Sequence, residues 1–262
     1  MISRTFFTAS VLTCALCLTV QGGTVTVGYF TDYNTSDTGP VAPITANGFT
    51  PVQITTLTGF NLNSINVLMI DESANGTPSA DFLGDAAAIA TWVQNGGVVA
   101  IDDRNVCQGT CTPIPGGAGI SLTTDPSATI NVQTGGNLLT NGPFGTITNS
   151  NLDGGYWSDH GYATQATLPA GALSILNNGT VGDIVAFGYQ DGLGYVYYST
   201  IPLDYDLDGT GSVPAFNSIY APNMLDFVSQ YSSNVSTPEP STLGLLGTGL
   251  LGLVFGARRK RT

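Results

Sequence analysis

The sequence is short of charge, and of positive charge above all. Only 9% of its 262 residues are charged, where globular domains average roughly a quarter. Residues 23–237 carry 17 carboxylates but one basic residue, Arg104, because the other five lie near the chain ends, at Arg4, Arg258, Arg259, Lys260 and Arg261. A middle with one arginine cannot neutralise a phosphate backbone or an anionic lipid surface, which excludes nucleic-acid binding.

Histidine and cysteine are almost as scarce. The one histidine, His160, follows Ser158 and Asp159, and three adjacent residues cannot converge on one substrate atom as a catalytic triad does. We therefore assign no catalytic residue. Outside the first 22 residues the cysteines are Cys107 and Cys111. In an exported protein such a pair is expected to form a disulfide, and a zinc site would need two further ligands.

The N-terminus has the pattern of a secretory signal. Arg4 precedes an apolar stretch from Phe6 to Val20, and Val20 and Gly22 are small enough for a cleavage site. We expect residues 1–22 to be removed on export, although a retained anchor helix is the alternative.

The C-terminus has three features in fixed order. A Pro238-Glu239-Pro240 tripeptide is followed by an uncharged, Leu- and Gly-rich stretch over 242–257, and then by four basic residues, Arg258, Arg259, Lys260 and Arg261. The apolar stretch would form about 24 Å of helix, and the basic cluster would keep its end cytoplasmic. This arrangement resembles the PEP-CTERM sorting signal. The resemblance implies recognition by exosortase, a membrane-embedded processing enzyme, and a place in a cell envelope.

These ends frame the predicted organisation of the chain. A signal peptide (1–22) precedes an exported domain (23–233), a linker with the Pro-Glu-Pro motif (234–241), a transmembrane helix (242–257) and a basic cytoplasmic tail (258–262). The chain would be exported and then either anchored in the membrane or released to the cell surface.

The first half of the middle predicts a parallel sheet. Strands are expected at 25–30, 51–57, 65–70 and 98–101, the last two as nearly continuous apolar runs of the kind buried on both faces. Between these two, Ser79 is a suitable N-cap for a helix that ends at Asn95-Gly96-Gly97. A strand, a helix and a second strand form a βαβ unit, and such units build parallel sheets.

The second half predicts a hairpin and a helix. Strands at 184–189 and 195–200 flank an Asp-Gly turn, and a final helix over 215–231 contains Pro222. Residues 104–180, rich in Gly, Thr, Asn and Pro, predict loops and short strands.

This middle resembles a class I glutamine amidotransferase-like domain, of which ThuA-like proteins are a branch. The resemblance rests on 67–71, on 92–99 with its Gly-Gly stop, and on 192–198. It implies an α/β fold with three layers and a mostly parallel sheet, of the flavodoxin-like or glutamine amidotransferase-like kind, with a late β-hairpin. The catalytic cysteine and histidine of the family have no counterparts in this sequence.

Carboxylates gather where the predicted strands end, which is where open parallel sheets bind ligands. They are Asp32, Asp71, Glu72, Asp102, Asp103 and the D-x-D-x-D-G run of Asp204, Asp206 and Asp208, with Arg104 beside them. Alternating oxygens before a glycine are typical of calcium loops, although position 12 is Ala215 in place of the usual Glu. The sequence leaves open a calcium site at Asp204, Asp206 and Asp208, with Asp71 and Asp102 as weaker candidates, or a solvated acidic turn.

Aromatic residues offer a further possibility. Tyr195, Tyr197, Tyr198, Tyr156, Trp157 and Tyr162 would stack on sugars or pack in the core. The leading hypothesis is a non-catalytic surface protein that acts in the extracellular polysaccharide matrix. The alternatives are a divergent metal-assisted hydrolase of polysaccharide that uses His160, and a calcium-dependent carbohydrate-binding module.

Overall fold

The computed structural model describes residues 24–154 and 157–232, and the sheet is their central feature. Five strands run parallel in the order β2-β1-β3-β4-β12, and β11, β10 and β6 continue the sheet antiparallel. The parallel strands are β2 (Thr50–Gln53), β1 (Thr26–Asp32), β3 (Val67–Glu72), β4 (Val98–Asp103) and β12 (Gly194–Ser199). The predicted signal peptide, linker, transmembrane helix and basic tail lie outside the described residues.

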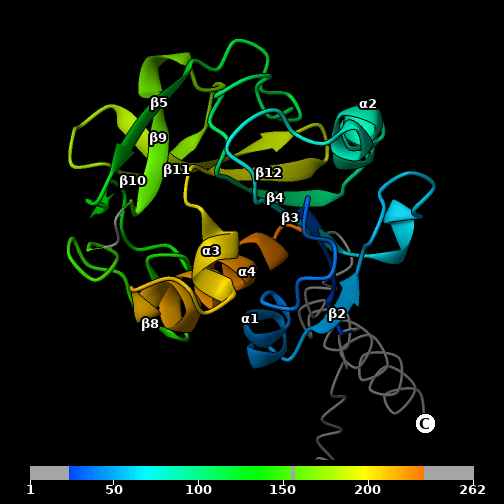
Figure 1. Cartoon of the computed structure of the whole chain (residues 1–262), viewed down its shortest axis with the longest axis horizontal. Coiled ribbons are helices and arrows are strands. Elements are labelled where there is room, and N and C mark those ends of the chain that lie inside the picture. Colours follow the sequence, from blue (N-terminus) through cyan, green and yellow to red (C-terminus); the bar gives the residue numbers. More distant parts are fainter. Residues whose placement is uncertain (1–23, 155–156, 233–262) are drawn as a thin grey trace, which may run out of the picture. The chain divides into compact units, whose positions relative to one another are not determined.

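Helices cover both faces of this sheet (Figure 1). On one face α2 (Ala80–Gln94) packs Phe82, Ile89 and Val93 onto the strands. On the other lie α1 (Val41–Ala46), α3 (Leu203–Leu207) and α4 (Ala221–Ser229), which share a second core with the strand residues of opposite parity. These layers confirm the predicted α/β class with its parallel central sheet.

Helix α2 begins and ends as its sequence predicts. The Ser79 hydroxyl accepts the Phe82 N–H at 3.2 Å, which caps the first turn. At the far end Gly96 has a φ of +107°, a conformation that glycine adopts without strain. The Trp92 ring lies 2.3 Å from where a Cβ on Gly97 would be, so the Gly-Gly pair both stops the helix and lets the ring close over the turn.

The late hairpin is also confirmed. Strands β11 (Asp183–Asp191) and β12 pair antiparallel from Asp191↔Gly194 to Ala186↔Ser199, and Gly192 in the turn has a φ of +61°. Because β12 also pairs parallel with β4, the hairpin joins the antiparallel half of the sheet to the parallel half. The predicted final helix is two helices in succession, the π-helix η3 (Phe216–Tyr220) and α4, with Pro222 in the first turn of α4.

Residues 104–180 form short strands and loops, in agreement with the sequence. Strand β9 pairs with both β5 and β11, β10 lies between β11 and β6, and β7 and β8 form a separate hairpin. Their bounds are β5 (Leu122–Ser127), β6 (Asn131–Val132), β7 (Asn141–Gly142), β8 (Gly145–Thr146), β9 (Asp159–Thr164) and β10 (Leu173–Asn177), with 3-10 turns η1 (Leu62–Ser64) and η2 (Gln165–Thr167).

Candidate functional site

Carboxylates end the neighbouring strands β1, β3 and β4 in register. Asp71 pairs with Asp102 and Glu72 pairs with Asp103 across β3 and β4, and the register continues to β1 and β12. Successive residues of a strand point to opposite faces, so two rows of side chains result. We call Thr31, Asp71, Asp102 and Ser199 the α4-facing row, and Asp32, Glu72 and Asp103 the α2-facing row.

The α2-facing row is built into the protein backbone. Asp103 Oδ1 accepts the N–H groups of Asn105 (2.8 Å) and Val106 (3.1 Å), and its Oδ2 accepts the Tyr198 hydroxyl at 2.6 Å. Asp32 accepts the Ser79 N–H at 2.7 Å at the start of α2. These carboxylates hold the loops that follow the strands. Burial and the nearby Asp32 charge raise the pKa of Glu72 to about 9.

The α4-facing row is poorly satisfied. Asp102 Oδ1 accepts hydroxyls from Ser199 (2.5 Å) and Tyr220 (3.0 Å). Among the described residues, however, neither oxygen of Asp71 nor Oδ2 of Asp102 has a hydrogen-bond partner, although Asp71 is only 1% exposed. Burial, with Asp102 and Asp204 nearby, raises the pKa of Asp71. Burial raises the pKa of Asp102 to about 7.

Arg104 lies directly after β4 and contacts this row through α3. Its Nη1 is 3.1 Å from Asp204 Oδ2 in a half-buried ion pair, and its guanidinium lies 5.7 Å from the centroid of the Tyr205 ring. Burial nevertheless raises the pKa of Asp204 to about 6 against the opposing effect of Arg104. The sequence placed Arg104 at this edge, and the structure confirms that position.

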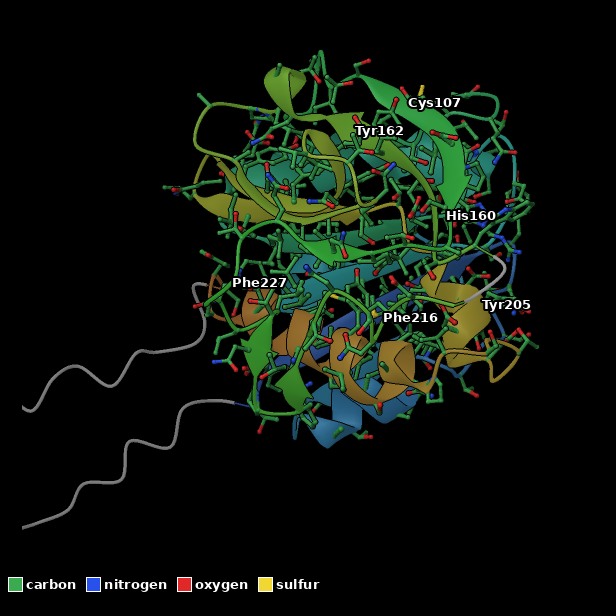
Figure 2. The ribbon with its side chains drawn as sticks, turned by 90° about the vertical axis from the view of Figure 1, so that its left-hand side faces the viewer. Cys107, His160, Tyr162, Tyr205, Phe216 and Phe227 are labelled. Atoms are coloured by element: carbon green, nitrogen blue, oxygen red, sulfur yellow. A yellow bond between two sulfur atoms is a disulfide. The ribbon has the colours of Figure 1, made fainter. Side chains whose placement is uncertain are left out.

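A cavity of about 320 Å³ opens beside Arg104. Two of its lining residues are exposed aromatics, Trp157 (45%) and Tyr205 (43%). Figure 2 shows His160, Tyr205 and Phe216 toward one side of the molecule, opposite Phe227. The full lining is Arg104, Trp157, His160, Pro202, Tyr205, Asp206, Ser212 and Phe216. The cavity therefore combines aromatic walls with a cation, a carboxyl group and an imidazole.

His160 lies in strand β9, and not in the loop that the sequence suggested. Its ring is 3% exposed, and Nδ1 lies 2.9 Å from the Arg104 carbonyl oxygen. Because a carbonyl only accepts, Nδ1 carries the hydrogen and Nε2 has the free lone pair. Burial lowers the pKa of His160 to about 4, so the ring is neutral at pH 7.

The D-x-D-x-D-G run does not form the loop on which the calcium prediction at these residues rests. Residues 203–207 are helix α3, in which side chains two apart do not share a face. Asp204 points inward to Arg104, Asp206 lines the cavity, and Asp208 bonds Thr210. Within the described residues no group of three or more His, Cys, Asp or Glu side chains is arranged to hold a metal. Calcium binding stays a prediction, for which the pair Asp71 and Asp102 is now the better position.

Burial in the core corrects the prediction for three of the aromatic residues. Tyr195, Tyr197 and Tyr198 are buried, because β12 lies inside the sheet with helices on both faces, so they cannot stack on a sugar. Tyr162 is half-buried, and Tyr156 lies outside the described residues. Trp157 is the one predicted aromatic that lines the cavity. Tyr205 was missed, although an aromatic residue between two aspartates was its signal.

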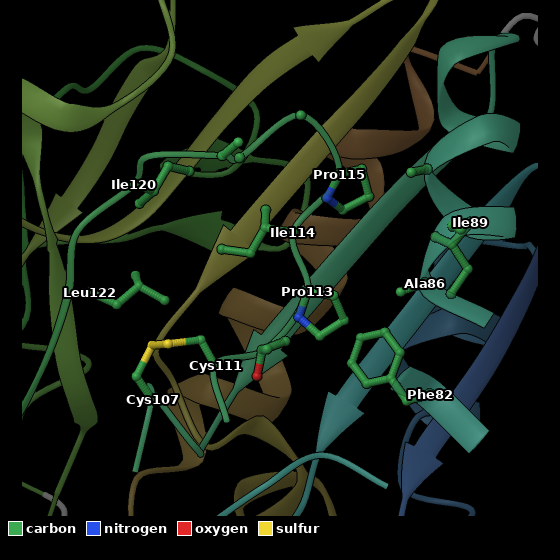
Figure 3. Close-up of a pocket in the computed structure, with 16 residues that line it drawn as sticks. Phe82, Ala86, Ile89, Cys107, Cys111, Pro113, Ile114, Pro115, Ile120 and Leu122 are labelled. Carbon is green, nitrogen blue, oxygen red and sulfur yellow. A yellow bond between two sulfur atoms is a disulfide. The ribbon is translucent and has the colours of Figure 1, made fainter. Parts of the chain in front are cut away.

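The Cys107–Cys111 disulfide is confirmed. It borders a second cavity, of about 460 Å³, between α2 and the loop at 111–122 (Figure 3). Side chains from Phe82, Ile89, Pro113, Ile114 and Leu122 line it. Its walls are apolar and hold no ionisable group, so the polar chemistry of this region belongs to the edge beside Arg104.

Comparison with known proteins identifies the C-terminal signal. Residues 236–260 match the PEP-CTERM protein-sorting motif. The motif marks an exported protein that exosortase processes and sorts at the membrane toward the cell surface. None of the helices within residues 24–154 and 157–232 has the length and apolar character that a membrane crossing needs, and the predicted span at 242–257 lies beyond them.

Solved structures resemble the middle at low identity. A β-galactosidase from Rahnella sp. R3 is 12% identical with a TM-score of 0.46, and the match covers 78% of this chain but only 31% of the galactosidase. A protein from Thermoplasma acidophilum described as one chain of a GMP synthase is 11% identical (TM-score 0.49; 79% and 96% covered). A cytoplasmic protein from Salmonella typhimurium is 14% identical (TM-score 0.48; 78% and 98% covered). No curated protein matches the sequence.

The features that carried the glutamine amidotransferase-like resemblance are present in the fold itself. A helix that ends in Gly-Gly leads into β4, and the β11–β12 hairpin precedes the last helices.

Proposed function

We propose that the protein is an exported domain that binds neutral polysaccharide outside the cell and is attached to the envelope through its C-terminal signal. One observation carries the proposal: at the carboxyl edge of the sheet, exposed Trp157 and Tyr205 line a cavity with Arg104 and Asp206. The predicted helix at 242–257 would hold the domain at the membrane until exosortase acts.

The chemistry of the cavity suits a sugar. A pyranose ring has a face of C–H groups, which packs on an aromatic ring, and a rim of hydroxyls, which need donors and acceptors. Trp157 and Tyr205 offer the rings, while Arg104 donates and Asp206 accepts. Arg104 is held in place by Asp204 and by the Tyr205 ring, and a group positioned before binding loses little entropy when the ligand arrives.

His160 and Asp204 support binding rather than hydrolysis. The Nδ1 hydrogen of His160 is engaged by the Arg104 carbonyl, and Asp204 is engaged by the Arg104 guanidinium. One observation favours the alternative of a metal-assisted hydrolase. Burial, with Asp204 and Asp208 nearby, raises the pKa of Asp206 to about 7, which suits a general acid.

Calorimetry on the full-length chain in detergent micelles tests the proposal. The probes are the β-1,4-linked disaccharides of glucose, mannose and galactose, and we expect at least one to bind. Trp157→Ala should weaken that binding at least tenfold. Leu193→Ala is the matched control, because Leu193 is 75% exposed at the hairpin turn, away from the carboxyl edge.

Two outcomes would contradict the proposal. Binding of none of the disaccharides, or equal binding by the Trp157→Ala chain, removes the cavity as a sugar site. Release of new reducing ends from the corresponding polysaccharide, lost in Asp206→Asn, would instead establish the hydrolase. Binding that disappears on chelation and returns with calcium would establish the calcium-dependent module.

A further inference from the structure

Tyr33 is an exposed aromatic residue in an unfavourable backbone conformation. It follows β1, it is 61% exposed, and its φ is +61°. Bulky side chains rarely adopt this left-handed region, where Gly and Asn are common. Its hydroxyl donates to the Thr77 carbonyl at 2.9 Å, and Asp32 accepts its N–H at 3.2 Å. The loop thus holds an aromatic ring in solvent at a cost in backbone strain, and such strain gathers at functional sites.

The strand order connects Tyr33 to the cavity beside Arg104. Tyr33, Ser73 and Arg104 follow β1, β3 and β4, which are neighbours in that order. The Ser73 hydroxyl donates to the Asp32 carbonyl, and the Ser73 carbonyl lies 3.5 Å from Arg104 Nη1. Adjacent strands are about 4.8 Å apart, so roughly 10 Å separates the axes of β1 and β4. Tyr33 is therefore too far from Trp157 to share one sugar ring with it, and near enough to contact another ring of the same chain.

We propose that Tyr33 forms a second aromatic subsite, so that the edge binds an extended stretch of a linear neutral polysaccharide. The chain would run from the cavity at Trp157 and Tyr205, past Arg104 and Ser73, to Tyr33. This inference rests on the proposed function and assigns it a ligand: several consecutive sugars of a polymer rather than a free mono- or disaccharide.

The charge of the domain selects a neutral polymer. Residues 23–237 contain 17 carboxylates and one arginine, and that arginine is already paired with Asp204. Asp208 is exposed and Asp206 lines the cavity itself. A polymer with one carboxylate per sugar would be repelled along this edge, whereas hydroxyl groups would find both a donor and acceptors.

The test compares ligand lengths in the full-length chain. For whichever disaccharide binds, the hexasaccharide of the same linkage should bind at least tenfold more tightly. Tyr33→Asn should remove about fivefold of that gain, the expected effect of losing one ring contact, and leave disaccharide affinity unchanged. Asparagine tolerates the left-handed conformation, so the variant should melt no lower than the parent. Trp157→Ala should weaken binding of both ligands.

The two proposals fail in different ways. If no disaccharide or hexasaccharide binds, the proposed function is wrong and the subsite falls with it. If the disaccharide binds and the hexasaccharide binds no better, or if Tyr33→Asn leaves the gain intact, the subsite alone is wrong. Tighter binding of an oligogalacturonate than of a neutral hexasaccharide would overturn the choice of a neutral polymer.

Discussion

The two rows of side chains at the carboxyl edge come from the same strands and differ by one residue in sequence. In the α2-facing row, Asp103 accepts three hydrogen bonds and fastens the loop after β4. In the α4-facing row, Asp71 is equally buried, and among the described residues no group donates to it. A carboxylate at a strand end can therefore support the fold or remain available, depending on which face of the sheet it meets.

The largest difference between the rows should come from removing Asp103. Asp103→Ala leaves the Tyr198 hydroxyl and two backbone N–H groups without an acceptor in the interior, and we expect a loss of about 3–5 kcal/mol in the free energy of unfolding. Urea unfolding measures it. Asp125→Ala removes an exposed carboxylate and should change stability by less than about 0.5 kcal/mol. Equal losses in the two variants would show that Asp103 does not fasten the loop.

A smaller effect is expected from pH. Buried carboxyl groups whose pKa is raised, such as Glu72 to about 9 and Asp102 to about 7, bind more protons folded than unfolded. The stability they contribute is present below the unfolded pKa and is lost as pH rises. His160, with its pKa lowered to about 4, has the opposite effect between about pH 6.5 and 4, but several carboxyls outweigh it. The melting temperature should fall from pH 5 to pH 9, and a rise would contradict these shifts.

Substitution of Asp71 isolates the α4-facing row. Asp71→Asn removes a buried acid with no donor, so it should raise the free energy of unfolding by about 2 kcal/mol at pH 8 and by less at pH 5. Denaturant unfolding at both pH values provides the comparison with Asp125→Asn. A loss at pH 8 as large as that expected for Asp103→Ala would mean that the two rows have the same role.

The smallest expected effect concerns calcium. If calcium binds at Asp71 and Asp102, ten times its dissociation constant stabilises the fold by about 1.4 kcal/mol. At pH 8 the melting temperature in millimolar calcium should exceed that in chelator, and Asp71→Asn should abolish the difference. An unchanged melting temperature in the parent chain would end the calcium prediction.

Short stretches of sequence were enough to predict the local elements and the sorting signal. Helix α2, with Ser79 at its start and Gly96-Gly97 at its end, and the hairpin around Gly192 were predictable because capping and turn chemistry depend on a few adjacent residues. The Pro-Glu-Pro motif with its apolar and basic stretches was likewise recognisable, since its features are contiguous. The placing of Asp71 and Asp102 at one edge followed from the rule that parallel strands end together.

Packing determined the role of each residue at that edge. The spacing of Asp204, Asp206 and Asp208 fits a loop and a helix alike, and only packing against β3 and β4 made it α3 and turned Asp204 toward Arg104. Tyr195 and Tyr33 are both tyrosines beside polar residues. One is buried because β12 lies between β4 and β11, and the other is exposed because it follows the last residue of β1. Exposure depends on which segments meet in space, and a single sequence does not contain that information.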